Sequence, residues 1–206
     1  MSNIRNLLAA ALLASAGNAV AASSVDLIVR GLITPSACVP TLPNGNEVDI
    51  GKISAKDLKA ENPTYLASRS LQLAVTCDAA TLMALESKDN RAGSHYNNDL
   101  EFGLGWINNG TEKLGGIELR ILNPVADGVA ARAISSYDGG LTWVNDRYLF
   151  RDNLVSVAIT SADTPIPVQL FTGDLNILPV IAPAKGLTLN NEVAIDGSVT
   201  LTVRYL

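Results

Sequence analysis

Apolar and polar residues alternate along two segments near the ends of the chain, which is the pattern of a β-strand with one buried face. The first segment is Ser24–Ile33, whose apolar parity holds Val25, Leu27, Val29, Gly31 and Ile33. The second is Ser198–Leu206, whose apolar parity holds Val199, Leu201, Val203 and Tyr205. An apolar strand at a chain end invites pairing with another chain. We therefore expect another copy of the protein to take up Ser24–Ile33.

Shorter apolar segments between turn signals predict further strands. Ser70–Cys77 alternates clearly, with Leu71, Leu73, Val75 and Cys77 on one face. The other expected strands are 47–53, 81–87, 100–107, 116–123, 142–150, 154–160, 166–171 and 175–182. Pro179 predicts that the last of them is an edge strand or carries a bulge. Residues 54–61 are expected to form one or two helical turns, and 88–98, 123–133 and 137–140 to form loops and turns. Short strands at this spacing favour an all-β sandwich.

The first 22 residues have the features of a secretory signal peptide. Arg5 supplies the positive charge, Leu7–Gly17 is the apolar region, and Ala19–Ala22 offers small residues for cleavage. The apolar region is shorter than the roughly 20 residues that a membrane span requires, and polar residues interrupt it. We therefore expect residues 1–22 to direct export and to be removed.

Export places the two cysteines, Cys38 and Cys77, in an oxidising compartment, where they have one possible intramolecular pairing. The bond would join the end of the first strand to the apolar face of Ser70–Cys77. Closing a loop of this length stabilises the fold by about 4 kcal/mol on the chain-entropy model.

Composition and motifs argue against several kinds of chemistry. With 15 basic and 20 acidic residues and no basic stripe, nucleic acid is not an expected partner. His95 is the one histidine, it lies in a polar segment, and no Gly-x-Ser-x-Gly elbow accompanies it, so a solvated surface histidine is expected. Trp106 and Trp143 are expected in the core. We expect no enzymatic activity, no cofactor and no metal site.

Four features together resemble subunits of chaperone–usher pili, in particular the β-fimbria major-subunit-like proteins of Gram-negative bacteria. They are the alternating amino-terminal segment with Gly31, the cysteine that follows it, Cys77 at the end of a strand, and the alternating carboxyl-terminal strand with Tyr205 in the penultimate place. They span most of the chain after the signal peptide. One departure is Gly197, which lies closer to the carboxyl terminus than the glycine that the family often has.

The resemblance implies an incomplete immunoglobulin-like sandwich, residues 35–206, that lacks its last strand, with a donor segment at 23–34. Strand addition of this kind would fill the missing place. Val25, Leu27, Val29 and Ile33 would enter the groove of a neighbouring copy, and Gly31 would lie where the groove is shallow. Val199, Leu201, Val203 and Tyr205 would form the groove edge. The implied partners are a periplasmic pilus chaperone, an outer-membrane usher, and other copies or sibling subunits in a head-to-tail fibre on the surface of a Gram-negative cell.

Three alternatives remain open from the sequence. A tip adaptor or adhesin-like binding module of the same system would share the sandwich. An outer-membrane β-barrel would need regular alternating spans with aromatic girdles, for which 2 Trp, 5 Tyr and 3 Phe are few. A secreted hydrolase would have to use His95 as its base.

Overall fold

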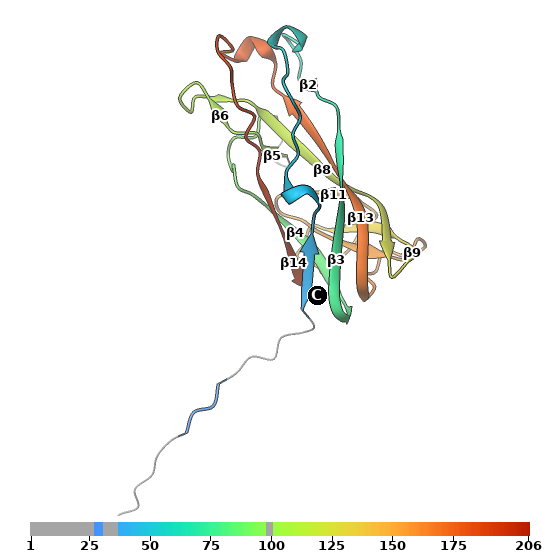
Figure 1. Cartoon of the computed structure of the whole chain (residues 1–206). Helices are drawn as coiled ribbons and strands as arrows, with labels where there is room; N and C mark the ends of the chain where they lie inside the picture. Colours follow the sequence, from blue (N-terminus) through green and yellow to red (C-terminus); the bar gives the residue numbers. More distant parts are fainter. Residues whose placement is uncertain (1–26, 31–36, 98–100) are drawn as a thin grey trace, which may run out of the picture. The chain divides into compact units, whose positions relative to one another are not determined.

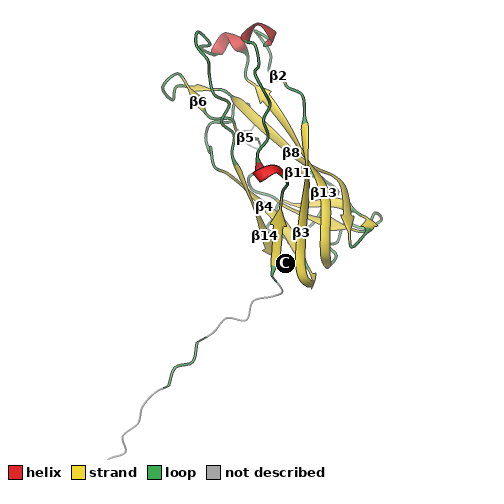
Figure 2. Cartoon of the chain, viewed as in Figure 1, coloured by secondary structure: helices red, strands yellow, loops and turns green. Residues whose placement is uncertain are grey.

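The structure, a computed structural model, describes residues 27–30, 37–97 and 101–206. Its strands pair into antiparallel sheets, and the helical segments within these ranges are short 3-10 turns (Figures 1 and 2). The strands are β1 (Cys38–Thr41), β2 (Thr64–Tyr65), β3 (Arg69–Thr81), β4 (Met83–Asp89), β5 (Phe102–Gly103), β6 (Trp106–Ile107), β7 (Glu112–Lys113), β8 (Gly115–Ala126), β9 (Val129–Ala130), β10 (Arg132–Ser136), β11 (Tyr148–Leu149), β12 (Leu154–Ala158), β13 (Val168–Ile181) and β14 (Val199–Tyr205). The 3-10 turns are η1 (Asn44–Asn46), η2 (Ala55–Asp57) and η3 (Ala184–Gly186).

Two sheets form the sandwich. The larger has the order β1-β3-β13-β8-β11, and β2, β5 and β9 attach to it through β13 and β8. The smaller has the order β10-β12-β4-β14, and β6 and β7 form a separate hairpin. Apolar side chains from both sheets form one buried cluster, which includes Val75 and Phe171 from the larger sheet and Leu85 and Val155 from the smaller. The predicted all-β sandwich is therefore confirmed.

The core follows the alternation in the sequence. In β3, Leu73, Val75 and Cys77 are buried while their neighbours face outward or are half-buried. The predicted disulfide between Cys38 and Cys77 is confirmed, and it joins directly opposed residues of β1 and β3. The bond therefore fixes the register of the edge strand β1 against its neighbour.

Some expected strands are wrong in extent or kind. Residues 47–53 are irregular, because no other described segment pairs with them, although Val48 and Ile50 are half-buried as an alternating strand would place them. Most of 142–150 is irregular as well: β11 is short, and Val144 makes a single bridge to Ser135. Conversely, the expected loop 123–133 contains the end of β8 and all of β9, where a hairpin bends back at Asp127 and Gly128.

The expectation of an edge position for Pro179 is also wrong. Pro179 lies in β13, which is continuous through both expected strands 166–171 and 175–182 and is central between β3 and β8. The Pro179 carbonyl accepts a hydrogen bond from the Leu66 N–H, so the missing N–H of Pro179 would face the same side. On that side there is a gap between strands, because β2 ends at Tyr65 and β3 begins at Arg69. The sheet therefore tolerates the missing N–H. The proline therefore lies at a break in the neighbouring ladder. Register shifts do occur in β13, at Val168/Leu170 and Thr172/Asp174.

Candidate strand-acceptor groove

Each sheet ends in a strand that has a partner on one side only within the described ranges. β14 pairs with β4 alone, and β1 pairs with β3 alone. The two edges lie near each other, because the Cys38 backbone N–H donates to the Tyr205 hydroxyl at 3.0 Å. The sandwich therefore has one side on which two open edges face the same space (Figure 1).

Backbone hydrogen bonds determine which residues of β14 face the open edge. Ser198 accepts from the Asn90 N–H, and the Leu206 N–H donates to Leu82, so even-numbered residues direct their backbone groups toward β4. In an antiparallel ladder the alternate residues direct theirs to the other side. The N–H and C=O groups of the odd-numbered residues therefore face the open edge: Val199, Leu201, Val203 and Tyr205.

The edge of β1 is different. Ala37 accepts from the Asp78 N–H, so the residues that face away from β3 are Cys38 and Pro40. The Cys38 N–H is already bound to Tyr205, and proline has no N–H to offer. Proline and occupied donors are the devices that protect an edge strand. An added strand would therefore find its backbone partners on β14 rather than on β1.

An apolar groove lies on this side of the sandwich, between two walls. One wall is formed by the chain after β1 and the other by 195–201, and the floor is formed by three strands of the larger sheet. The apolar residues that line it are Leu42, Val48, Ile50, Leu71, Leu104, Ile117, Leu119, Leu175, Ile177, Pro179, Ile195, Val199 and Leu201. Val199 and Leu201 pack against the core yet remain half-exposed. The groove thus combines an apolar floor, of which only Leu71 and Ile177 are half-exposed, with backbone groups of β14 that have no partner among the described residues.

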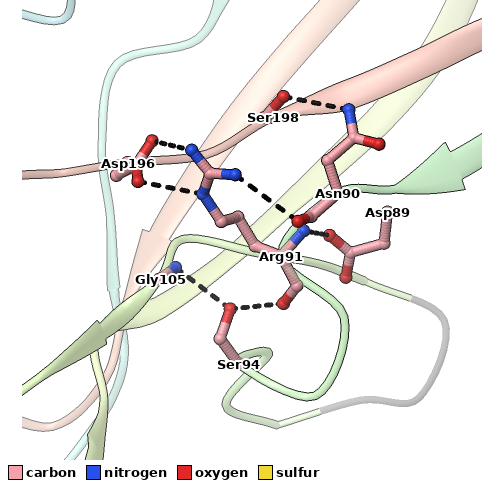
Figure 3. A network of polar contacts seen from close by, with 7 residues as sticks. All are labelled: Asp89, Asn90, Arg91, Ser94, Gly105, Asp196 and Ser198. Carbon is pink, nitrogen blue, oxygen red and sulfur yellow. Dashed lines mark hydrogen bonds and ion pairs between the residues drawn. The ribbon is translucent and has the colours of Figure 1, made fainter. Parts of the chain in front are cut away.

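A polar network fastens the groove wall where β14 begins (Figure 3). Arg91 donates two hydrogen bonds to the Asp196 carboxylate, at 2.6 and 2.9 Å. The hydrogen bond to this guanidinium lowers the pKa of Asp196. Asn90 holds the next part of the wall, because its side chain donates a hydrogen bond to the Ser198 hydroxyl at 3.0 Å.

The base of this network is tied to the hairpin region that follows β5. Ser94 is buried and its hydroxyl donates to the Arg91 carbonyl at 2.7 Å while accepting from the Gly105 N–H at 3.0 Å. Asp89 accepts from the Arg91 N–H at 2.8 Å. These bonds hold Arg91 in place, and Arg91 in turn holds the wall at Asp196.

Gly197 allows the wall to approach the floor closely. A Cβ atom at this position would lie inside van der Waals contact with Ile117 and 3.0 Å from the Leu104 side chain. A larger residue would therefore force the ends of the Ile117 and Leu104 side chains to shift. Gly197, whose position differs from that of the glycine in the pilus subunits that the sequence resembles, therefore has a packing role in this chain.

The residues predicted from the sequence divide into two groups. The groove-edge residues Val199, Leu201, Val203 and Tyr205 share one strand and one open edge, as described above. Of the donor residues, Leu27 and Val29 lie in a segment without regular structure and are 87% and 85% exposed. Val25, Gly31 and Ile33 lie outside the described residues.

The sequence did not identify the floor of the groove. Leu71, Ile117 and Ile177 come from three strands that are far apart in the chain, and only their register brings them together. The alternation of Val48 and Ile50 is visible in the sequence and predicts a strand, whereas the structure places both residues in a wall of the groove. That alternation was the one signal that could have located this side of the groove.

Two expectations about single residues are wrong. His95 is half-buried rather than solvated, because it lies on the turn that packs beside β5. Trp106 is 47% exposed rather than in the core, and the Lys113 ammonium lies 5.6 Å from its ring centroid across the β6–β7 hairpin. Trp143 is half-buried.

Across residues 27–30, 37–97 and 101–206, no three His, Cys, Asp or Glu side chains gather into a group that could hold a metal ion. Within the same ranges, no helix has the length and apolarity to cross a bilayer.

The fold and the groove define an all-β sandwich with two neighbouring open edges and one disulfide. Residues 27–122 match the family model described as "Protein of unknown function (DUF1120)". The chain is similar to "Uncharacterized protein YhcF" of Escherichia coli K12, with 32% identity over 94 residues, which cover 46% of this chain and 39% of YhcF. It is also similar to "Protein GltF" of the same organism, with 28% identity over 258 aligned positions that cover 96% of this chain and 95% of GltF. No fimbrial-subunit family is among these matches.

Proposed function

We propose that the protein is a structural subunit of a bacterial surface fimbria, without enzymatic activity, that polymerises by donor-strand complementation after binding a periplasmic chaperone. The observation that carries the proposal is the edge of β14. Four consecutive odd-numbered residues there, from Val199 to Tyr205, direct backbone groups to an open side, next to a groove with an apolar floor. A strand with alternating apolar residues is the ligand that such an edge accepts.

The chain contains a segment with the matching pattern. Val25, Leu27, Val29 and Ile33 share one parity, with Gly31 between them. Burying four such side chains is worth about 6–12 kcal/mol before ordering costs are subtracted. New backbone hydrogen bonds to β14 add to this and make the joint slow to open.

The geometry of the joint determines the assembly. The donor segment and the groove are different surfaces, so the contact between copies is head-to-tail and generates an open filament rather than a closed pair. An unfilled groove leaves the side chains of Leu71, Ile177, Val199 and Leu201 half-exposed before assembly. In this proposal a periplasmic chaperone covers them, and an outer-membrane usher exchanges the chaperone for the donor segment. We place the assembled protein on the cell surface.

The proposal is tested by placing charged residues on one face of the donor segment and then on the other. Leu27→Asp combined with Val29→Asp should abolish SDS-resistant oligomers on gels run without boiling, and filaments in electron micrographs, because charges would enter the apolar groove. Ile28→Asp is the matched control, since Ile28 lies in the same segment on the opposite parity. It should assemble like the unmodified chain.

Filaments formed equally well by the double variant would show that this segment is not the donor. Monomers from every variant, including the unmodified chain, would show that the sandwich does not polymerise through its groove.

A further inference from the structure

The chain enters the sandwich at the same end at which it finishes. Ala37 and Cys38 begin the described sandwich, and the Cys38 N–H is bound to the penultimate residue, Tyr205. Leu206 continues from there and its N–H donates to the Leu82 carbonyl at 3.1 Å. The junction to the donor segment and the carboxyl terminus therefore lie side by side.

Exposed apolar side chains gather at this end. Leu82, Tyr205 and Leu206 are each 40–44% exposed, and Leu141 is 84% exposed. Leu141 follows Gly140, where a built Cβ would lie 3.7 Å from Leu206 Cδ2, so the loop that carries Leu141 lies beside the Leu206 side chain. We call these four residues the exit patch. Adjacent apolar residues that remain exposed are typical of an interaction surface.

The loop that presents Leu141 is held in one conformation. The Asp138 carboxylate accepts from the backbone N–H groups of Leu141 and Thr142, at 3.1 and 2.9 Å, and from the Thr142 hydroxyl at 2.5 Å. These bonds, with a further one from Ser136, lower the pKa of Asp138 to about 2, so it remains a carboxylate acceptor at neutral pH. An apolar side chain on a preorganised loop loses little conformational entropy on binding.

The covalent chain limits how far a neighbouring copy can lie from this end. Only Thr34–Ala37 separate Ile33, the last donor residue, from Cys38. A fully extended backbone covers at most about 18 Å between the Cα atoms of Ile33 and Cys38. If Ile33 lies in the groove of a neighbour, the body of that neighbour must therefore lie close to Tyr205 and Leu206.

We propose that the exit patch is a second contact between subunits, in which Leu82, Leu141, Tyr205 and Leu206 pack against the copy of this chain that accepts its donor segment. This inference rests on the proposed function, because the position of the accepting copy is deduced from where its groove would hold the donor segment. The contact would restrict bending at each joint and slow the release of the donor strand.

The test uses the same substitution in the two different subunits of one joint. Acceptor chains carry Leu27→Asp and Val29→Asp, so they can receive a donor but cannot give one. They are mixed in excess with chains that have an intact donor segment, and the dimers are isolated by size. Leu141→Asp is placed either in the donor chain, where the exit patch faces the joint, or in the acceptor chain, where it faces away.

We expect Leu141→Asp in the donor to speed dimer dissociation about tenfold, the order expected when one leucine loses its buried contact. The same change in the acceptor should leave the rate unchanged. Leu206→Asp provides an independent second variant of the patch, and thermal melting of each subunit checks that it remains folded.

Equal dissociation rates for both placements would overturn the exit patch while leaving donor-strand exchange in place. Failure of the unmodified donor to form any dimer would overturn the proposed function, and this inference with it.

Discussion

Glu101 shows how one residue departs from the pattern of an apolar core. It is buried, with 7% of its surface exposed, and its Oε2 atom has no hydrogen-bond partner among the described residues. Gly116 faces it so closely that a Cβ there would overlap Oε2. Burial raises the pKa of Glu101, and the negative charge of Glu118 raises it further. A carboxylate at this position is therefore costly at neutral pH.

We predict that Glu101→Gln stabilises the protein at neutral pH. A group whose pKa is raised in the folded state stabilises it below the usual value, here 4.5, and loses that contribution as pH rises through the raised value. The advantage of the variant in urea denaturation should therefore shrink as pH falls from 7 toward 4.5.

Glu47→Gln, at an exposed position, serves as the control and should not show this trend. A stability difference between Glu101→Gln and the unmodified protein that stays constant with pH would contradict the prediction.

At the scale of elements, the sequence predicted those strands whose pattern is local. β3 alternates from Leu71 to Cys77 and β14 from Val199 to Tyr205 in sequence, so the existence of these strands and their inward faces could be predicted. Residues 47–53 alternate too, yet no described strand pairs with them. Periodicity reports which side chains turn inward, but it does not report whether a neighbour supplies hydrogen bonds.

The position of β13 and the floor of the groove depend on information that is not local. Pro179 indicates an edge when its missing N–H is considered alone, but the break between β2 and β3 removes the conflict. Likewise, Leu71 and Ile117 meet at the floor only because β3 and β8 flank β13 in a particular register. The sequence contains the residues of the site but not the pairing that brings them together.

The disulfide leads to a prediction for the element β1. Replacing both cysteines by serine should lower the free energy of unfolding by about 4 kcal/mol, because the closed loop of 39 residues no longer restricts the unfolded chain. Urea unfolding of the double variant and of the reduced unmodified protein should give matching midpoints, both below that of the oxidised protein. Coincident midpoints for the oxidised and reduced proteins would refute this account of the bond.

At the scale of the whole molecule, the two open edges are not equivalent. Pro40 and the bond from Cys38 to Tyr205 protect β1, whereas β14 leaves the backbone groups of four residues available. The polar network at Asp196 and the hydrogen bond at Tyr205 hold the two ends of this edge. The sandwich therefore presents one prepared strand edge beside an apolar floor, and we interpret the alternating amino-terminal segment as what fills it.

Residue-resolved amide hydrogen exchange of β14, in the chain with Leu27→Asp and Val29→Asp and in the assembled unmodified protein, tests this claim most directly. Thr200 and Thr202 face β4 and should be protected in both forms. Leu201 and Val203 face the open edge and should exchange rapidly in the unassembled variant but become protected in the assembly. If Leu201 and Val203 exchange equally fast in both forms, β14 does not accept a strand and the proposed donor-strand joint is wrong.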